Sequence, residues 1–211
     1  MAVLLGLTAA VASAAAEPSA SIATVRCMSD GEGYLRARIR GAIGAELDWS
    51  NAGTECIGGV RPADGGIRLR FSRRDGADDA TADRHSSNAA RPEAPSGGGD
   101  TEDEPGALVL VFGISGLEEG RAARSVPVNV TVIREGRGQF YSTRGDDKCM
   151  LDEVAQEPIV GIPHRSRAYR IVARGYCTQP ARAVRGAGAV LLSRFDFAGR
   201  VDFDNEYTGT P

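Results

Sequence analysis

The sequence has few of the side chains that carry most protein chemistry. It contains only two histidines, His85 and His164, in 211 residues. No G-x-S-x-G motif marks a nucleophilic serine, and no pair of closely spaced cysteines or histidines marks a zinc site. Because His85 lies in a polar, disorder-prone stretch, His164 is the one candidate base for a serine–histidine–aspartate site. These absences disfavour the common hydrolase and zinc-enzyme classes.

Aromatic residues and excess charge are also scarce. Aromatics make up 6% of the chain, and Trp49 is its one tryptophan, so a core would rest on valine, leucine, isoleucine and alanine. The formal net charge of -3 gives no overall attraction to nucleic acid or to an anionic membrane. No apolar run is long enough to cross a bilayer as a helix. We therefore expect no nucleic-acid partner and no membrane span, and the sequence predicts no cofactor.

The N-terminus has the pattern of a secretory signal. A short apolar run at 3–11 is followed by small residues, and the A-x-A patterns at 12–14 and 14–16 both fit a signal-peptidase site. The segment lacks the usual basic residue at its start, and a buried N-terminal helix is the alternative interpretation. We predict a signal peptide at 1–16, a single mature domain at 17–211, and a periplasmic or secreted location.

The four cysteines, Cys27, Cys56, Cys149 and Cys177, fit an exported protein with two disulfides. Three pairings are possible. We favour Cys27–Cys56 and Cys149–Cys177, because the chain between the members of each pair is long enough for a strand pair to bring its ends together. Each closed loop would stabilise the fold by about 3 kcal/mol in the chain-entropy model.

Alternating apolar and polar residues predict β-strands along most of the chain. The clearest case is the stretch in which Val126, Val128, Val130 and Val132 share one face, followed by a glycine-rich turn and a returning strand at 139–143. Further strands are predicted at 35–40, 46–49, 67–71, 107–114, 169–177, 191–197 and 201–203, with 50–66 as turns and 150–158 as a loop or edge segment. Leu191, Ser193, Phe195 and Phe197 are expected to share one face.

A row of arginines lies on the outer face of the first predicted strand. Arg36, Arg38 and Arg40 alternate there with apolar residues. If 35–40 and 46–49 form a hairpin, Glu46 and Asp48 lie across from these arginines, and such pairs are mildly favourable, at about 0.2–1 kcal/mol each. The alternative is a basic strip that binds a polyanion such as an acidic glycan.

The composition changes abruptly at 72–106, where Asp, Ala, Arg, Ser, Pro and Gly replace nearly all large apolar residues. Such a stretch cannot bury enough surface to offset the entropy of ordering it. We predict a long disordered loop inserted between two strands of one domain. Short strands separated by turn signals indicate an all-β fold, namely an antiparallel β-sandwich, with an open β-barrel as the alternative.

Carboxylates near Cys149 are the remaining candidates for chemistry. Asp146, Asp147, Asp152 and Glu153 supply the hard oxygen ligands that calcium prefers. Their spacing does not match an EF-hand, and the flanking Arg144 and Lys148 indicate a salt-bridged turn instead. The same carboxylates could act in hydrolysis, Asp146 or Asp147 working with His164 or with a distant serine.

Four segments resemble a group of uncharacterised exported bacterial proteins with the same order of landmarks. These segments are 37–56 (ARIRGAIGAELDWSNAGTEC), 127–149 (PVNVTVIREGRGQFYSTRGDDKC), 175–184 and 191–199. The resemblance implies an exported, four-cysteine, β-rich protein and no particular activity, so it assigns no catalytic residue. Two hypotheses follow: a non-catalytic periplasmic or secreted protein that binds an envelope component, a glycan or another protein, and an envelope-directed hydrolase.

Overall fold

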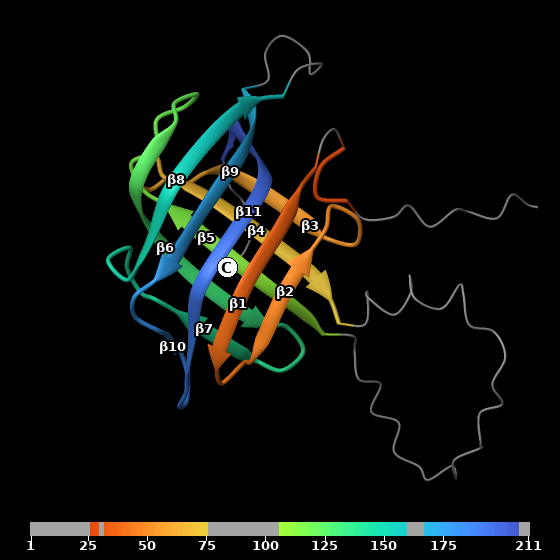
Figure 1. Ribbon diagram of the computed structural model, residues 1–211, viewed down its shortest axis with the longest axis vertical. Helices are drawn as coiled ribbons and strands as arrows, with labels where there is room; N and C mark the ends of the chain where they lie inside the picture. The colour runs from red at the N-terminus through yellow and green to blue at the C-terminus, as the bar shows by residue number, and fades with distance from the viewer. Residues whose placement is uncertain (1–25, 30–31, 76–105, 160–166, 207–211) are drawn as a thin grey trace, which may run out of the picture.

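The computed structural model describes residues 26–29, 32–75, 106–159 and 167–206, and these form eleven β-strands without a helix among them (Figure 1). The strands are β1 (Tyr34–Gly41), β2 (Ala45–Trp49), β3 (Glu55–Val60), β4 (Ile67–Arg74), β5 (Ala107–Ile114), β6 (Ala123–Arg134), β7 (Gln139–Ser142), β8 (Cys149–Pro158), β9 (Ala168–Cys177), β10 (Ala181–Ala183) and β11 (Ala189–Glu206). No helix in the described part of the chain is long and apolar enough to span a membrane.

The strands form two layers that pack face to face. In Figure 1 the layer of β8, β9, β11, β1 and β2 lies in front of a layer that contains β6, β5, β4 and β3, with the strands of the two layers crossing. Pairing of β8 with β6 and of β3 with β11 joins both layers into one hydrogen-bonded sheet. All pairings between these strands are antiparallel except β3 with β11. The prediction of an all-β antiparallel fold is confirmed.

Phenylalanine rings fill the centre of the space between the layers. Phe112 packs against Phe197 with ring centroids 4.6 Å apart and against Phe195 at 5.1 Å, and Phe71 lies 5.5 Å from Phe197. A Cβ added at Gly199 would lie 2.9 Å from Cζ of Phe71, so glycine there lets the ring approach β11. Four of the six phenylalanines therefore lie at the centre of the core, which the sequence had predicted to rest on valine, leucine, isoleucine and alanine.

Val126, Val128, Val130 and Val132 are all buried, as their alternation predicts. Three other strand predictions need correction. Residues 150–158 belong to β8 rather than to a loop, β3 lies within the predicted turns 50–66, and the two predicted strands at 191–197 and 201–203 are one continuous β11. In β11 a register shift against β1 makes Leu192, not Leu191, the buried residue, because the irregularity moves the following side chains to the other face.

The predicted loop at 72–106 begins later than expected. Ser72, Arg73 and Arg74 belong to β4, because they pair in register with Val109, Leu108 and Ala107 of β5. Residues 76–105 lie outside the described residues, as does the predicted signal peptide at 1–16.

Both favoured disulfides are present. Cys27–Cys56 ties the segment before β1 to β3, and Cys149–Cys177 joins two residues that pair directly between β8 and β9. Two intramolecular disulfides fit an oxidising compartment.

Candidate functional site

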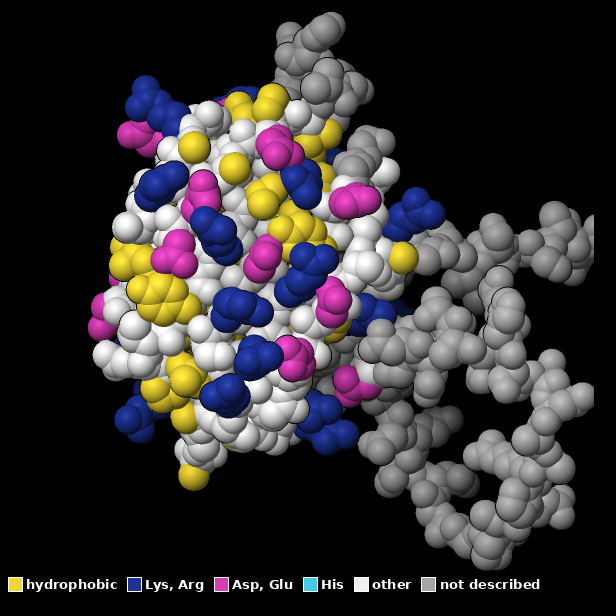
Figure 2. Space-filling model, viewed as in Figure 1, with side chains coloured by type: hydrophobic (Ala, Val, Ile, Leu, Met, Phe, Trp, Pro, Cys, Tyr) yellow, Lys and Arg dark blue, Asp and Glu magenta, His cyan; other side chains and the backbone are white. Residues whose placement is uncertain are grey.

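A row of charged side chains crosses the five strands of the front layer on its outer face and continues onto β6. Each member pairs in register with the next, and the signs alternate. We call this set the charged row: Asp48 (β2), Arg36 (β1), Asp196 (β11), Arg174 (β9), Glu153 (β8) and Arg124 (β6). Figure 2 shows the alternation of basic and acidic side chains over this face. On β1, β2, β9 and β11 the residues immediately before and after each member are buried in the core, so the member itself faces outward.

Neighbours within the charged row form ion pairs toward its two ends. Arg36 Nε lies 3.1 Å from Asp48 Oδ1, and Arg174 Nη2 lies 2.8 Å from Glu153 Oε2. These pairs confirm the predicted hairpin contacts of β1 and β2, together with Arg38 Nη2 at 2.7 Å from Glu46 Oε1. Since all these side chains are exposed, each pair contributes about 0–1 kcal/mol to stability.

Asp196 lies at the centre of the row, and its two cross-strand neighbours form their ion pairs with other carboxylates. Arg36 binds Asp48, and Arg174 binds Glu153. The Tyr34 hydroxyl donates a hydrogen bond to the Asp196 carboxylate. Burial of Tyr34, followed by this hydrogen bond and the negative charge of Asp196, raises the pKa of Tyr34 to about 12. A carboxylate has about four acceptor positions, so Asp196 can accept further hydrogen bonds.

Three arginines gather around one carboxylate beside the row. Arg38 pairs with Glu46 on β2 but directly faces Arg194 on β11. The hydrogen bond from Arg38, then its charge, and then the more distant charges of Arg194 and Arg40 lower the pKa of Glu46. We call Arg38, Arg40 and Arg194 the arginine cluster. Against one carboxylate, its three cations leave a local excess of positive charge.

A hollow of about 630 Å³ lies between the charged row and the arginine cluster. Ala37, Leu47 and Phe195 line it while their side chains are buried in the core, so the backbone of β1, β2 and β11 forms its floor. A smaller hollow of about 250 Å³ adjoins it and shares Arg174 and Asp196 as lining residues. We call the larger hollow the charged groove. Its volume falls in the range of small-molecule binding sites.

No family model, curated protein or solved structure matches this chain.

The structure places the predicted calcium candidates in two separate positions. Asp146 and Asp147 lie in the loop before β8, where Asp147 Oδ1 is 3.4 Å from Lys148 Nζ. Asp152 and Glu153 follow within β8, and the three steps along the strand from Cys149 to Asp152 span about 10 Å. One calcium ion requires all its ligands within about 2.6 Å. Among the described residues, no group of three or more His, Cys, Asp or Glu side chains could hold a metal ion.

His164, the candidate base of the hydrolase hypothesis, lies outside the described residues, as does His85. The carboxylates that the structure does bring to a common hollow are Asp48, Asp152 and Asp196, together with Glu46. Of these, only Asp152 was a predicted site residue. The sequence alone does not single out Asp196, Arg174 or Arg194, because it does not reveal that β11 lies between β1 and β9.

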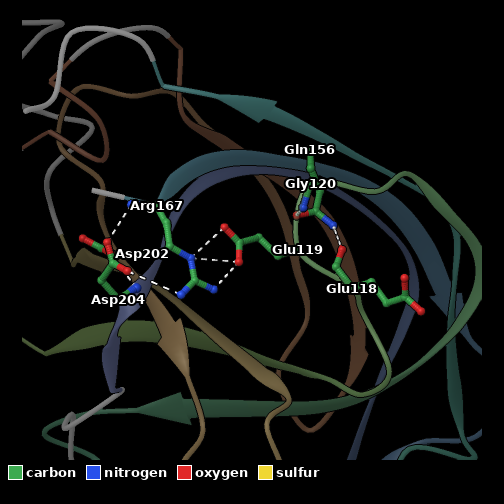
Figure 3. A network of polar contacts seen from close by, with 7 residues as sticks. All are labelled: Glu118, Glu119, Gly120, Gln156, Arg167, Asp202 and Asp204. Carbon is green, nitrogen blue, oxygen red and sulfur yellow. Dashed lines mark hydrogen bonds and ion pairs between the residues drawn. The ribbon is translucent and has the colours of Figure 1, made fainter. Parts of the chain in front are cut away.

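A second polar network lies at the end of the molecule where β9 begins and β11 ends (Figure 3). Arg167 Nε donates to both carboxylate oxygens of Glu119 at 2.9 Å, and the Arg167 backbone N–H donates to Asp204 Oδ2 at 2.7 Å. Gln156 accepts a hydrogen bond from the Gly120 N–H at 3.0 Å. These contacts hold the loop between β5 and β6 against β8 and the strand ends. We call this network the loop clasp and assign it a structural role.

Proposed function

We propose that this protein is an exported, non-catalytic binding protein that acts in the periplasm or outside the cell. Its ligand is an envelope component that carries an anionic group, and the arginine cluster binds that group. The two disulfides support the location.

The observation that carries the proposal is the direct pairing of Arg38 with Arg194 across β1 and β11. Like charges placed opposite each other destabilise a sheet. Glu46 offsets only part of this repulsion, and neither Arg40 nor Arg194 forms an ion pair with a described carboxylate. An anion bound between these guanidinium groups would remove the repulsion and gain charge-assisted hydrogen bonds. Guanidinium groups bind carboxylate, phosphate and sulfate oxygens in a bidentate manner.

Binding of dextran sulfate to the purified mature protein, measured by isothermal titration calorimetry at low salt, tests this function. We expect Arg194→Gln to weaken binding by about tenfold, the loss typical of one charge-assisted contact. Arg137→Gln is the matched control, because Arg137 is equally cationic, exposed in the turn after β6, and far along that strand from the groove. Equal losses in both variants would mean that net charge rather than the arginine cluster determines binding.

A further inference from the structure

We infer that the anionic ligand is an acidic polysaccharide, which lies in the charged groove across β1, β11 and β9. The inference rests on the proposed function, which concerns only the arginine cluster. It adds a second wall to the site, which carries carboxylates, and thereby a requirement for hydroxyl groups on the ligand.

The two walls of the groove differ in their side chains and therefore recognise different groups. Arg38 and Arg194 lie on one wall with Glu46, whereas on the other wall Asp48 and Asp196 alternate with Arg36 and Arg174, and Asp152 adds a further carboxylate. Carboxylates accept hydrogen bonds and cannot donate them when ionised. A polyphosphate offers only acceptors and negative charge, so these carboxylates would repel it. A polysaccharide of uronic acids offers a carboxylate for the arginines and hydroxyl donors for the carboxylates.

Asp196 is the acceptor best placed to bind ligand hydroxyls. Arg36 and Arg174 each bind another carboxylate, which leaves Asp196 with the Tyr34 hydroxyl as its hydrogen-bonding side chain among the described residues. Asp152 adds a second acceptor, because a register shift between β8 and β9 leaves it exposed next to Glu153 rather than on the core face.

The dimensions of the groove fit a chain of sugar rings. Its two walls stand two residues apart along each strand, about 6.5–7 Å, which is close to the width of one pyranose ring. The groove crosses the strands from β2 to β9, or three strand spacings of about 4.8 Å each. Tyr176 follows Gly175, a lining residue of the groove, on β9. Its side chain is 40% exposed and lies on the same face of the strand as Arg174. Its ring offers an apolar surface with a polar tip to the next sugar.

Binding of oligogalacturonate and of inorganic polyphosphate to the full mature protein tests the inference. The wild type should bind oligogalacturonate more tightly. Asp196→Asn, which keeps the side-chain shape and an acceptor for Tyr34, should weaken oligogalacturonate binding about fivefold or more, yet leave polyphosphate binding unchanged or stronger, because it removes a repulsive charge. Asp152→Asn should act in the same direction. Asp147→Asn, an exposed aspartate in the loop before β8, is the matched control and should change neither affinity.

The outcomes separate this inference from the proposed function. If Asp196→Asn and Asp152→Asn strengthen binding of both polyanions equally, the ligand is recognised by charge alone, and the polysaccharide inference is wrong while the arginine cluster remains the binding site. If the wild type binds neither polyanion and Arg194→Gln changes nothing, the proposed function itself is wrong. Thermal unfolding and near-ultraviolet circular dichroism of each variant establish that it is folded.

Discussion

Tyr34 lies beside the charged row, and its pKa is strongly raised. Burial and the hydrogen bond to Asp196 raise its pKa from 10.0 to about 12. The folded protein therefore holds the phenolic proton more tightly than the unfolded chain does. This preference stabilises the fold fully below about pH 10, and the stabilisation is lost as pH rises through the folded-state pKa near 12.

We therefore expect Tyr34 to ionise about two pH units later than an ordinary tyrosine. An ultraviolet absorbance titration of the tyrosinate band, with the wild type compared with Tyr34→Phe, isolates this residue. Asp196→Asn should shift the same transition toward lower pH, because it removes the negative charge that opposes ionisation. A Tyr34 transition at its ordinary position in the wild type would contradict both the burial of Tyr34 and its hydrogen bond to Asp196.

At the scale of strands, alternation within each segment predicted the core-facing residues well. The valines of β6 and the arginine and acid pairs of β1 and β2 followed from side-chain period alone. Two irregularities escaped prediction, near Ser193 in β11 and at Asp152 in β8, because a bulge breaks the alternation that identifies a strand. The charged row could not be predicted from the sequence either. Its members come from six strands, and the order of those strands depends on packing between distant segments rather than on local sequence.

The loop clasp gives a prediction at the same scale. Replacing Glu119 by Gln removes the ion pair with Arg167, and we expect Tm at neutral pH to fall by roughly 1–3 °C, the change typical of an exposed pair. The hydrogen bond from Arg167, opposed in part by burial, lowers the pKa of Glu119. The ionised Glu119 therefore stabilises the fold above the usual glutamate pKa, and this stabilisation is lost as pH falls through the lowered pKa of Glu119.

Thermal unfolding of the wild type and of Glu119→Gln across acidic pH measures this loss, and the two melting curves should converge as the pH falls. Glu118→Gln is the control, because Glu118 is a neighbouring glutamate whose partner, Arg121, belongs to the same loop. It should leave Tm nearly unchanged. If the difference in Tm between the wild type and Glu119→Gln stays constant with pH, the charge of Glu119 does not hold the loop between β5 and β6.

For the whole molecule, the two disulfides close chain segments of nearly equal length, with sequence separations of 29 and 28 residues. In the chain-entropy model each therefore stabilises the fold by about 3 kcal/mol. Their structural settings differ. Cys149 and Cys177 are already held by the long pairing of β8 with β9, whereas the segment at Cys27 is attached mainly through Asn51, which accepts hydrogen bonds from the Cys27 and Met28 N–H groups.

We predict that removing either disulfide lowers Tm by about 6–12 °C. Only the Cys27–Cys56 disulfide, however, should control local opening of the segment at Arg26. Without Cys27–Cys56, the segment at Arg26 can leave Asn51 while the sheet stays folded, so trypsin should cleave after Arg26 faster in Cys27→Ala/Cys56→Ala. In Cys149→Ala/Cys177→Ala that cleavage should keep the wild-type rate, because the Cys27–Cys56 disulfide is intact. Limited proteolysis below Tm with mass spectrometry of the products measures both rates. Faster cleavage at Arg26 in both variants would mean that the whole sheet opens together, and that the Cys27–Cys56 disulfide does not hold the segment at Arg26 independently of the sheet.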